Sequence, residues 1–244
     1  MSRQVPADSV WFDHAVVVVR DQMSNVAPRF EGQGFMLSEE ATHNVGSHNR
    51  LIVLSDTYVE LLGWPPGTPA PRAEIAASAV GFDAIVFRTD DAEATHQRLR
   101  EGGFVVSPVT ELTRPAMVDG GRAQARFTTV RFAEQPIRGI RVYFCQHLTP
   151  ELVWQPRLMA HDNGVTVLRR VQAQAPDPST VADLLRQMAG GARRHARHHE
   201  VVLANTTIQV ASAPARSEAR LVGVTLGTDD GSEVELDLTA ASLA

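Results

Sequence analysis

Runs of apolar residues, some continuous and some alternating with polar ones, divide the chain into short strands and a few helices. The clearest run spans residues 11–21, where four consecutive valines follow His14 and an Arg-Asp pair ends the run. β-Branched residues favour an extended, buried backbone, so this run predicts a central strand. His14 would then lie at the mouth of that strand and face a cavity. A weaker copy of the run spans residues 81–90.

Both copies begin the same predicted order of elements, β-α-β-β-β. In the first copy the elements are residues 11–21, 22–31, 35–38, 51–54 and 58–62. In the second copy they are residues 83–88, 91–101, 104–106, 125–132 and 140–145. The repeat predicts tandem modules at residues 1–63 and 80–155, with a Pro-rich linker at residues 64–79.

The remaining residues, 156–244, predict a further α/β unit. Its strand-like segments are residues 165–171, 201–210 and 221–226, and a helix capped by Asp177 covers residues 178–188. The apolar strands need a partner surface, so the unit is expected to pack against the modules. Its element order suggests a degenerate third module. The fold class is therefore α+β.

Composition excludes several classes of function. The 244 residues carry a formal net charge of −5 and include no lysine, which argues against nucleic-acid binding and against Schiff-base or P-loop chemistry. The single cysteine, Cys145, rules out an internal disulfide and is typical of a reducing compartment. Because no apolar run approaches the length of a membrane span and residues 1–10 resemble no signal peptide, we expect a cytoplasmic protein without membrane or nucleic-acid partners.

Two polar residues inside predicted strands are candidates for chemistry. His14 begins the first strand, and Glu60 lies among the apolar residues of the segment at residues 58–62. A buried glutamate needs a cation or a hydrogen-bond partner, so Glu60 is either half of a structural salt bridge or a metal ligand paired with His14. The two copies align with an offset of 70 residues at Phe12 and Phe82, or of 69 at Asp21 and Asp90. We chose the second offset, which places Asp83 at the position of His14.

Three segments of the first copy carry a resemblance to a known family. The segments at residues 12–18, 46–52 and 56–62 resemble the glyoxalase-like branch of the vicinal oxygen chelate superfamily, which also contains bleomycin-resistance proteins and extradiol dioxygenases. The resemblance covers about residues 11–155. It implies paired β-α-β-β-β modules that form a cupped mixed sheet around one divalent metal ion. It also implies isomerase, lyase or dioxygenase chemistry on a small oxygenated substrate that chelates the ion.

The resemblance also implies which residues do this chemistry. In the family pattern the ligands come from the first and last strands of each module, which correspond here to His14, Glu60, Asp83 and Gln146. Glu60 would double as the catalytic base, and the ion would be Fe, Mn, Zn or Ni. The expected substrate contacts are His48, Asn49, Arg50, Tyr58, Phe144 and His147.

Several alternatives remain open on the sequence. A shift of one residue in the last strand would turn Cys145 and His147 to the cavity in place of Gln146. Those two residues could also form a thiol nucleophile, although the sequence offers no evident acidic partner. The same fold serves as a metal-free small-molecule binder or resistance protein, and a homodimer is possible. The basic stretch at residues 193–199 is interpreted as a solvated loop.

Overall fold

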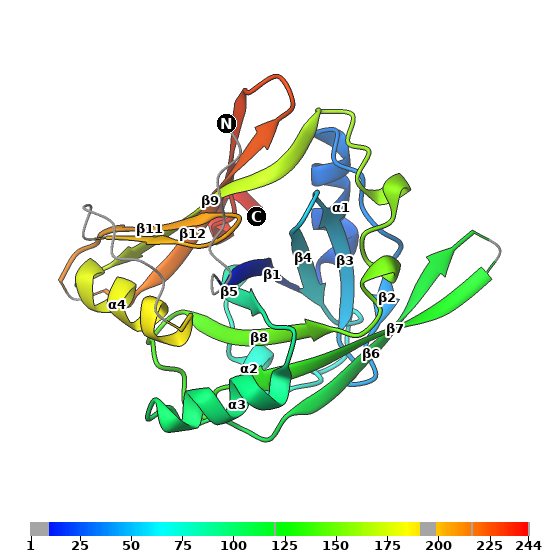
Figure 1. Cartoon of the computed structure of the whole chain (residues 1–244). Helices are drawn as coiled ribbons and strands as arrows, with labels where there is room; N and C mark the ends of the chain where they lie inside the picture. Colours follow the sequence, from blue (N-terminus) through cyan, green and yellow to red (C-terminus); the bar gives the residue numbers. More distant parts are fainter. Residues whose placement is uncertain (1–9, 120, 191–198, 216, 244) are drawn as a thin grey trace.

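The computed structural model describes residues 10–119, 121–190, 199–215 and 217–243, which form two mixed sheets with helices packed against them (Figure 1). The first sheet has eight strands in the order β2-β3-β4-β1-β5-β8-β7-β6. Its strands are β1 (Trp11–Arg20), β2 (Ala41–Thr42), β3 (His48–Val53), β4 (Tyr58–Gly63), β5 (Gly81–Arg88), β6 (Thr110–Val118), β7 (Gly121–Arg131) and β8 (Arg141–His147).

Each half of the first sheet is one β-α-β-β-β module. In the first module α1 (Met23–Gly32) follows β1, and β1 pairs in parallel with β4. In the second, α3 (Ala92–Glu101) follows β5, and β5 pairs in parallel with β8. A short helix, α2 (Ala73–Ala76), lies between the modules, and the antiparallel β1/β5 pair joins them. The predicted fold class of tandem modules in a cupped mixed sheet is confirmed, whereas the exact module boundaries stay a prediction.

The β1/β5 ladder corrects the offset between the modules. Ala15 pairs with Ile85 at its centre, and the pairs on either side repeat under a shift of 70 residues: His14↔Val86 with Val16↔Ala84, and Trp11↔Arg88 with Val18↔Gly81. Asp13 therefore corresponds to Asp83, and His14 corresponds to Ala84. The expected placement of Asp83 at the position of His14 is wrong. The ladder shifts register at Asp13 and at Asp83, since each is the extra residue of a β-bulge, and a bulge changes the face to which later side chains point.

Two short strands were expected in the wrong places. Residues 35–38 are not a strand, and residues 104–106 contain only an isolated bridge at Val106. The edge strands are instead β2 and β6, which lie outside the expected strands, in segments with no apolar run and read as loops. β6 was overlooked because its side chains alternate between the interior and solvent, which dilutes its apolar character.

The first sheet curves until its two edges approach each other (Figure 1). The backbone N–H of Asn44, just after β2, donates to the carbonyl of Thr113 on β6, and the Asn44 side chain accepts from the Thr113 N–H. Two short 3-10 turns, η1 (Pro150–Leu152) and η2 (Pro156–Leu158), follow β8 and bury Val153 and Leu158 against the inner face of the sheet. The inner face is thereby enclosed, and one core lies inside the curve.

The residues after β8 form a second, five-stranded sheet, ordered β10-β11-β9-β12-β13. Its elements are β9 (Val165–Ala175), α4 (Pro178–Met188), β10 (Glu200–Val202), β11 (Thr207–Ser212), β12 (Arg220–Thr228), β13 (Glu233–Asp237) and α5 (Ala240–Leu243). The segment expected to be one strand at residues 201–210 is therefore two strands joined by a turn. β9 pairs in parallel with β11, as β1 does with β4, so the part of the unit from β9 to β11 repeats a module with one strand fewer, and β12 and β13 are additional strands.

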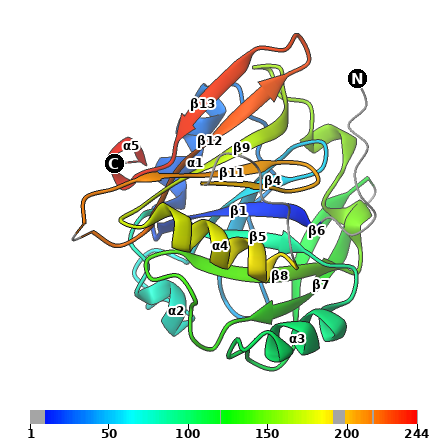
Figure 2. The ribbon, with the colours of Figure 1, turned by 60° about the vertical axis from the view of Figure 1, so that its left-hand side comes forward.

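The second unit packs on the outer face of the first sheet (Figure 2). Buried residues of α4 belong to the same core as Phe87 and Phe144. The Asn205 side chain hydrogen-bonds both the N–H and the carbonyl of Phe12, at 2.9 and 3.0 Å. The expected packing of this unit is thus confirmed. The stretch at residues 193–199 lies outside the described residues except for His199. No helix in the described part of the chain is long and apolar enough to cross a bilayer.

Candidate functional site

The inner face of the first sheet encloses a small cavity. Its wall includes side chains from β1, β3, β4, β6, β7 and β8, and its polar members are His14, His43, Asn49, Tyr58, Glu60, Arg114, Thr129 and Tyr143. The cavity has a volume of ≈ 20 Å³, which is room for a water or an ion. The first and last strands of the first module therefore meet at one enclosed polar point.

His14 lies at the centre of this group of polar side chains. Its side chain is buried, with 3% exposure, so it does not lie at the open mouth of a strand as expected. Its Nδ1–H donates to Asp13 at 2.7 Å, and its Nε2 accepts from the Tyr143 hydroxyl at 3.0 Å. Its ring also stacks on Tyr58, with ring centroids 4.3 Å apart. Because Nδ1 carries the proton, the lone pair of Nε2 points into the cavity.

Glu60 faces His14 across the cavity. Its Oε2 lies 3.8 Å from His14 Nε2, and its Oε1 accepts a 2.8 Å hydrogen bond from Asn49. Burial alone would raise the pKa of Glu60, but the neighbouring His43, His14 and Asn49 lower it below its ordinary value. Glu60 is therefore a buried carboxylate, as expected for a metal ligand or a base.

His43 is a site residue that the sequence did not reveal. It lies in the turn between β2 and β3, where its Nδ1 contacts the Ser47 hydroxyl at 3.0 Å and its Nε2 lies 3.8 Å from Glu60 Oε1. Burial lowers its pKa to about 4, so its imidazole is neutral. A histidine in a polar loop gives no periodic signal; only the folding of the turn over β3 and β4 brings it to the cavity.

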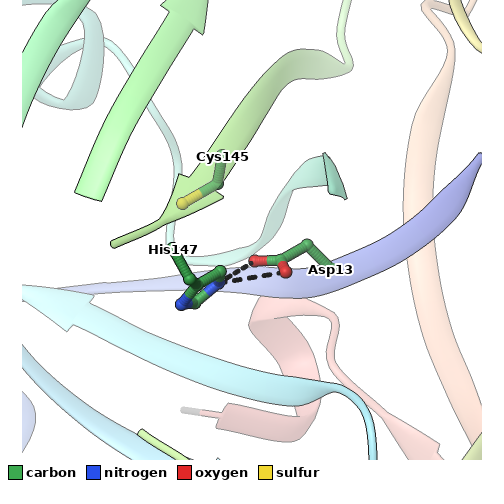
Figure 3. Close-up of side chains that lie close together, drawn as sticks. All are labelled: Asp13, Cys145 and His147. Atoms are coloured by element: carbon green, nitrogen blue, oxygen red, sulfur yellow. Dashed lines mark hydrogen bonds and ion pairs between the residues drawn. The ribbon is translucent and has the colours of Figure 1, made fainter. Parts of the chain in front are cut away.

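Asp13 connects the cavity to a second histidine. It is fully buried and accepts hydrogen bonds from His14 and from Arg88 Nε, the latter at 2.8 Å. It also accepts from His147 Nε2 at 2.9 and 3.0 Å (Figure 3). Burial would raise the pKa of Asp13, but His147 and His14 hold it well below the usual range. The expected substrate contact His147 thus lies near the site, yet as a partner of Asp13.

Cys145 lies beside this pair (Figure 3). One ligand atom from each of Asp13, Cys145 and His147 lies within 4.8 Å of the others, a spacing that a metal ion could bridge. The carboxylate, however, is already paired with Arg88 and accepts hydrogen bonds from the two imidazoles, and an adjacent guanidinium repels a cation. Asp13 is also the acidic partner that the hypothesis of a thiol nucleophile lacked. Even so, burial raises the pKa of the Cys145 thiol well above its ordinary value, which disfavours the thiolate.

We expect Cys145 to be inert in the folded protein. Its side chain is 3% exposed and its thiol is protonated at neutral pH, so a disulfide reagent such as DTNB should leave it unreacted in native buffer. The same reagent should titrate one thiol per chain after denaturation in guanidinium. Rapid reaction in native buffer would restore Cys145 as a nucleophile.

The other expected site residues lie away from the cavity. Asp83 forms an ion pair with Arg141, and Gln146 hydrogen-bonds Asp90 and the N–H of Ala92 at the start of α3. Neither approaches the point shared by His14 and Glu60. Phe144 packs on Phe87 in the outer core. His48 bonds Glu40, and Arg50 bonds Glu31 and the Ser38 carbonyl. Among the expected substrate contacts, Asn49 and Tyr58 do line the cavity.

The register explains which residue takes the place of Gln146. Glu60 is opposite Val16 in the first module, and Tyr143 is opposite Val86 in the second, so Tyr143 corresponds to Glu60. Tyr143, Cys145 and His147 share the inner face of β8, and Gln146 points outward. The shift of one residue left open by the sequence is the one that the fold adopts.

The donor set of the cavity fits a divalent metal ion. Two ligand atoms on one such ion lie about 3–4 Å apart, and His14 Nε2 and Glu60 Oε2 meet this spacing at 3.8 Å. The Asp13 carboxylate orients the imidazole through Nδ1, an arrangement common behind metal-bound histidines. The Tyr143 hydroxyl donates a hydrogen bond to the same nitrogen at 3.0 Å, and this bond must break when Nε2 binds an ion. The second module supplies no histidine or carboxylate to this point.

Comparisons with known proteins agree with this architecture. Residues 12–189 match a family described as a glyoxalase-like domain. No protein with a curated function matches the sequence significantly. A hypothetical protein from Staphylococcus aureus superposes with a TM-score of 0.67 at 15% identity, over 93% of this chain and 98% of that chain. A mutant of 4-hydroxymandelate synthase from Streptomyces coelicolor superposes with a TM-score of 0.55 at 12% identity, over 91% of this chain and 72% of that one.

At such identities the likeness between structures establishes the fold alone. The family match, in contrast, spans most of the chain and includes both modules. It also covers the strands that carry His14 and Glu60. The chain therefore belongs to the glyoxalase-like family.

Proposed function

We propose that this protein is a divalent-metal-dependent enzyme that acts on a small oxygenated molecule, with His14 and Glu60 as protein ligands of the ion. The observation that carries the proposal is the approach of His14 Nε2 to Glu60 Oε2, at 3.8 Å, in an enclosed cavity. A bound ion would supply Lewis-acid stabilisation of negative charge on a substrate oxygen. The reaction would be of the isomerase, lyase or dioxygenase type.

The chain's own residues have distinct tasks in this proposal. Asp13 fixes the tautomer and the orientation of His14 through the bond to Nδ1. Asn49 holds Glu60 Oε1, which leaves Oε2 turned toward His14. Glu60 is also the proposed proton acceptor, because it is an ionised carboxylate among buried side chains.

Tyr143 completes the polar group around the reacting point. Burial raises the pKa of its hydroxyl, so the oxygen keeps its proton and remains a hydrogen-bond donor. In the structure it donates to His14 Nε2. Toward a substrate the same O–H is placed to donate to a carbonyl or alkoxide oxygen. Apolar side chains from the neighbouring strands, among them Leu51 and Phe127, exclude water from the rest of the wall.

Metal stoichiometry in matched variants tests the proposal. We expect the untagged protein, incubated with Mn²⁺ or Zn²⁺ and desalted, to retain about one ion per chain by elemental analysis. His14→Ala and Glu60→Gln should each lose the ion. His48→Ala is the matched control, because this histidine bonds Glu40 away from the cavity, and it should retain the ion. A wild-type protein that retains no metal under any of these conditions would contradict the proposal.

His14→Ala should also destabilise the fold. A ligand at an exposed strand end would cost little to remove, but His14 is buried and satisfies Asp13 and Tyr143. We therefore expect His14→Ala to lower the free energy of unfolding by about 1–3 kcal/mol. Circular dichroism must show that each variant is folded before its metal content is interpreted.

A metal-free small-molecule binder is the second candidate. It is favoured by one observation: Tyr143 and Ala84 occupy the positions in the second module that match Glu60 and His14. A site with two protein ligands binds an ion less tightly than one with four. Ligand binding by wild-type protein that is indifferent to EDTA would support this candidate.

A further inference from the structure

Arg114, on β6, contacts both the cavity of His14 and Glu60 and a second cavity next to it. The second cavity has a volume of ≈ 30 Å³ and is lined by residues of β6 and of the turns after β8, among them Met117, Leu152 and Leu158. A guanidinium shared by two adjoining cavities can hold one end of a ligand whose other end reaches the polar point at His14.

The guanidinium of Arg114 is buried without a carboxylate partner. Arg114 is 5% exposed. Among the described residues the guanidinium makes one hydrogen bond, in which Nη1 donates to the carbonyl of Pro115 at 3.1 Å. No carboxylate of the described chain lies within ion-pair distance of it. The guanidinium carbon of Arg114 lies 5.9 Å from the centre of the Phe127 ring, within cation–π range.

This situation differs from that of the other buried arginines at the sheet. Arg141 pairs with Asp83, and the half-buried Arg88 pairs with Asp13. A buried charge without a partner is costly, and burial indeed lowers the pKa of Arg114. An anion that enters the cavity would remove this cost, since a guanidinium edge matches the two oxygens of a carboxylate.

The nearby carboxylates of the chain already have other partners. Glu39, which lines the second cavity, forms two hydrogen bonds with Arg157, at 2.8 and 3.0 Å. Glu60 is held by Asn49 and faces His14 and His43. The charge of Asp13 is balanced by Arg88. Glu60 and Glu39 partly offset the effect of burial on the pKa of Arg114, yet neither pairs with it. Within the described residues no carboxylate is left to pair with the guanidinium, so an anion from outside could take this place.

We infer that Arg114 binds the carboxylate of the substrate, which makes the substrate a short oxo- or hydroxycarboxylic acid. The inference rests on the proposed function for the other end of the molecule, where the oxo or hydroxy oxygen reaches the point between His14 and Glu60. Arg114 and Glu60 line the same cavity. Because this cavity has a volume of only ≈ 20 Å³, an acid bound there must also occupy the adjoining ≈ 30 Å³ cavity and displace part of the wall between them. A neutral analogue would leave the guanidinium unpaired and would bind more weakly.

The test compares acids with their neutral amides as probes. The full chain, treated with EDTA and dialysed, is titrated by calorimetry with 2-oxo acids from pyruvate to phenylpyruvate and with the corresponding amides. We expect at least one acid to bind at least about tenfold more tightly than its amide. Arg114→Gln should lose about 10- to 100-fold in affinity for that acid and little for the amide.

Two further variants keep the result interpretable. Arg126→Gln, on neighbouring β7, removes an exposed arginine paired with Glu111 and should leave both affinities unchanged. Arg114→Lys keeps the charge without the planar fork, so it should bind the acid less tightly than wild type and still prefer it to the amide. If Arg114→Gln does not fold, the affinity of Arg114→Lys for the acid tests the role of Arg114 in its place.

The outcomes separate this inference from the proposed function. Equal binding of acid and amide by wild type, no binding of any acid, or an unchanged acid affinity in Arg114→Gln would each overturn the role of Arg114. These titrations contain no metal, so they stand even if the chain proves to bind none. Loss of metal binding with an intact preference for acids would remove the metal enzyme and leave the anion site in place.

Discussion

Asp13→Ala is expected to lower the free energy of unfolding by about 3–5 kcal/mol, the largest loss of stability among the predicted variants. Asp13 is fully buried and receives hydrogen bonds from His14, His147 and Arg88. Its removal leaves a guanidinium without its counter-charge and two buried imidazoles without their acceptor. A partner removed from a buried ionic group costs far more than an exposed pair contributes.

The variant should also affect the candidate metal site. Without Asp13 nothing among its present partners fixes the Nδ1–H tautomer of His14, so the Nε2 lone pair is no longer held toward Glu60. Loss of such an orienting group typically lowers metal affinity about 10- to 100-fold. Urea unfolding measures the stability, and titration with Mn²⁺ measures the affinity.

Asp13→Asn and Glu111→Ala are the comparisons for this result. Asparagine keeps the shape but turns an NH₂ group toward a donor, so it should still destabilise the fold. Glu111→Ala removes one side of the exposed pair with Arg126 and should cost less than about 1 kcal/mol. An Asp13→Ala protein as stable as Glu111→Ala would show that the hydrogen-bond network around Asp13 does not support the fold.

Gly63→Ala is expected to be the second most destabilising change, at the upper end of the roughly 1–3 kcal/mol range for overpacked sites. A Cβ atom at Gly63 would lie 2.2 Å from the backbone carbonyl oxygen of Arg20. That oxygen accepts the N–H of Trp64 at 3.0 Å, and Arg20 itself has a φ of 55°, a conformation that bulky residues rarely adopt. The backbone therefore has little freedom to move aside.

The clash would also displace β4 near Glu60. Arg20 pairs with Gly63 at the end of the β1/β4 ladder, three residues beyond Glu60. We expect a lower melting temperature in Gly63→Ala together with reduced metal retention. Gly32→Ala is the matched control, because nothing lies within 4 Å of a Cβ there, and it should be neutral or more stable by up to about 1 kcal/mol. Equal melting temperatures for the two variants would contradict this account of the β1/β4 junction.

The central strands of the first sheet, which are buried on both faces, could be identified from sequence. The valines of β1 and the apolar residues of β4, β5 and β8 form runs that predict a buried strand without knowledge of their neighbours. The repeat of these runs was enough to predict tandem modules. β2 and β6 were missed because an edge strand that faces solvent on one side has little apolar signal.

The residues of the site likewise fall into those that the sequence could predict and those that it could not. His14 and Glu60 could be predicted because a polar residue inside an apolar strand is costly unless it has a partner. The partners could not be predicted. His43 comes from a turn, Arg114 from a strand that was read as a loop, and Tyr143 from a face of β8 that depends on register.

The sequence by itself determined that two buried, repeated strand sets would form a sheet with a histidine and a glutamate among their apolar residues, because burial and β-branching are local properties of the chain. The tertiary structure alone decided which side chains share the cavity. Side-chain direction alternates at every residue, so the bulges at Asp13 and Asp83 move ligand-type residues off the inner face. The second module consequently presents Ala84 and Tyr143, and no histidine or carboxylate, to the cavity.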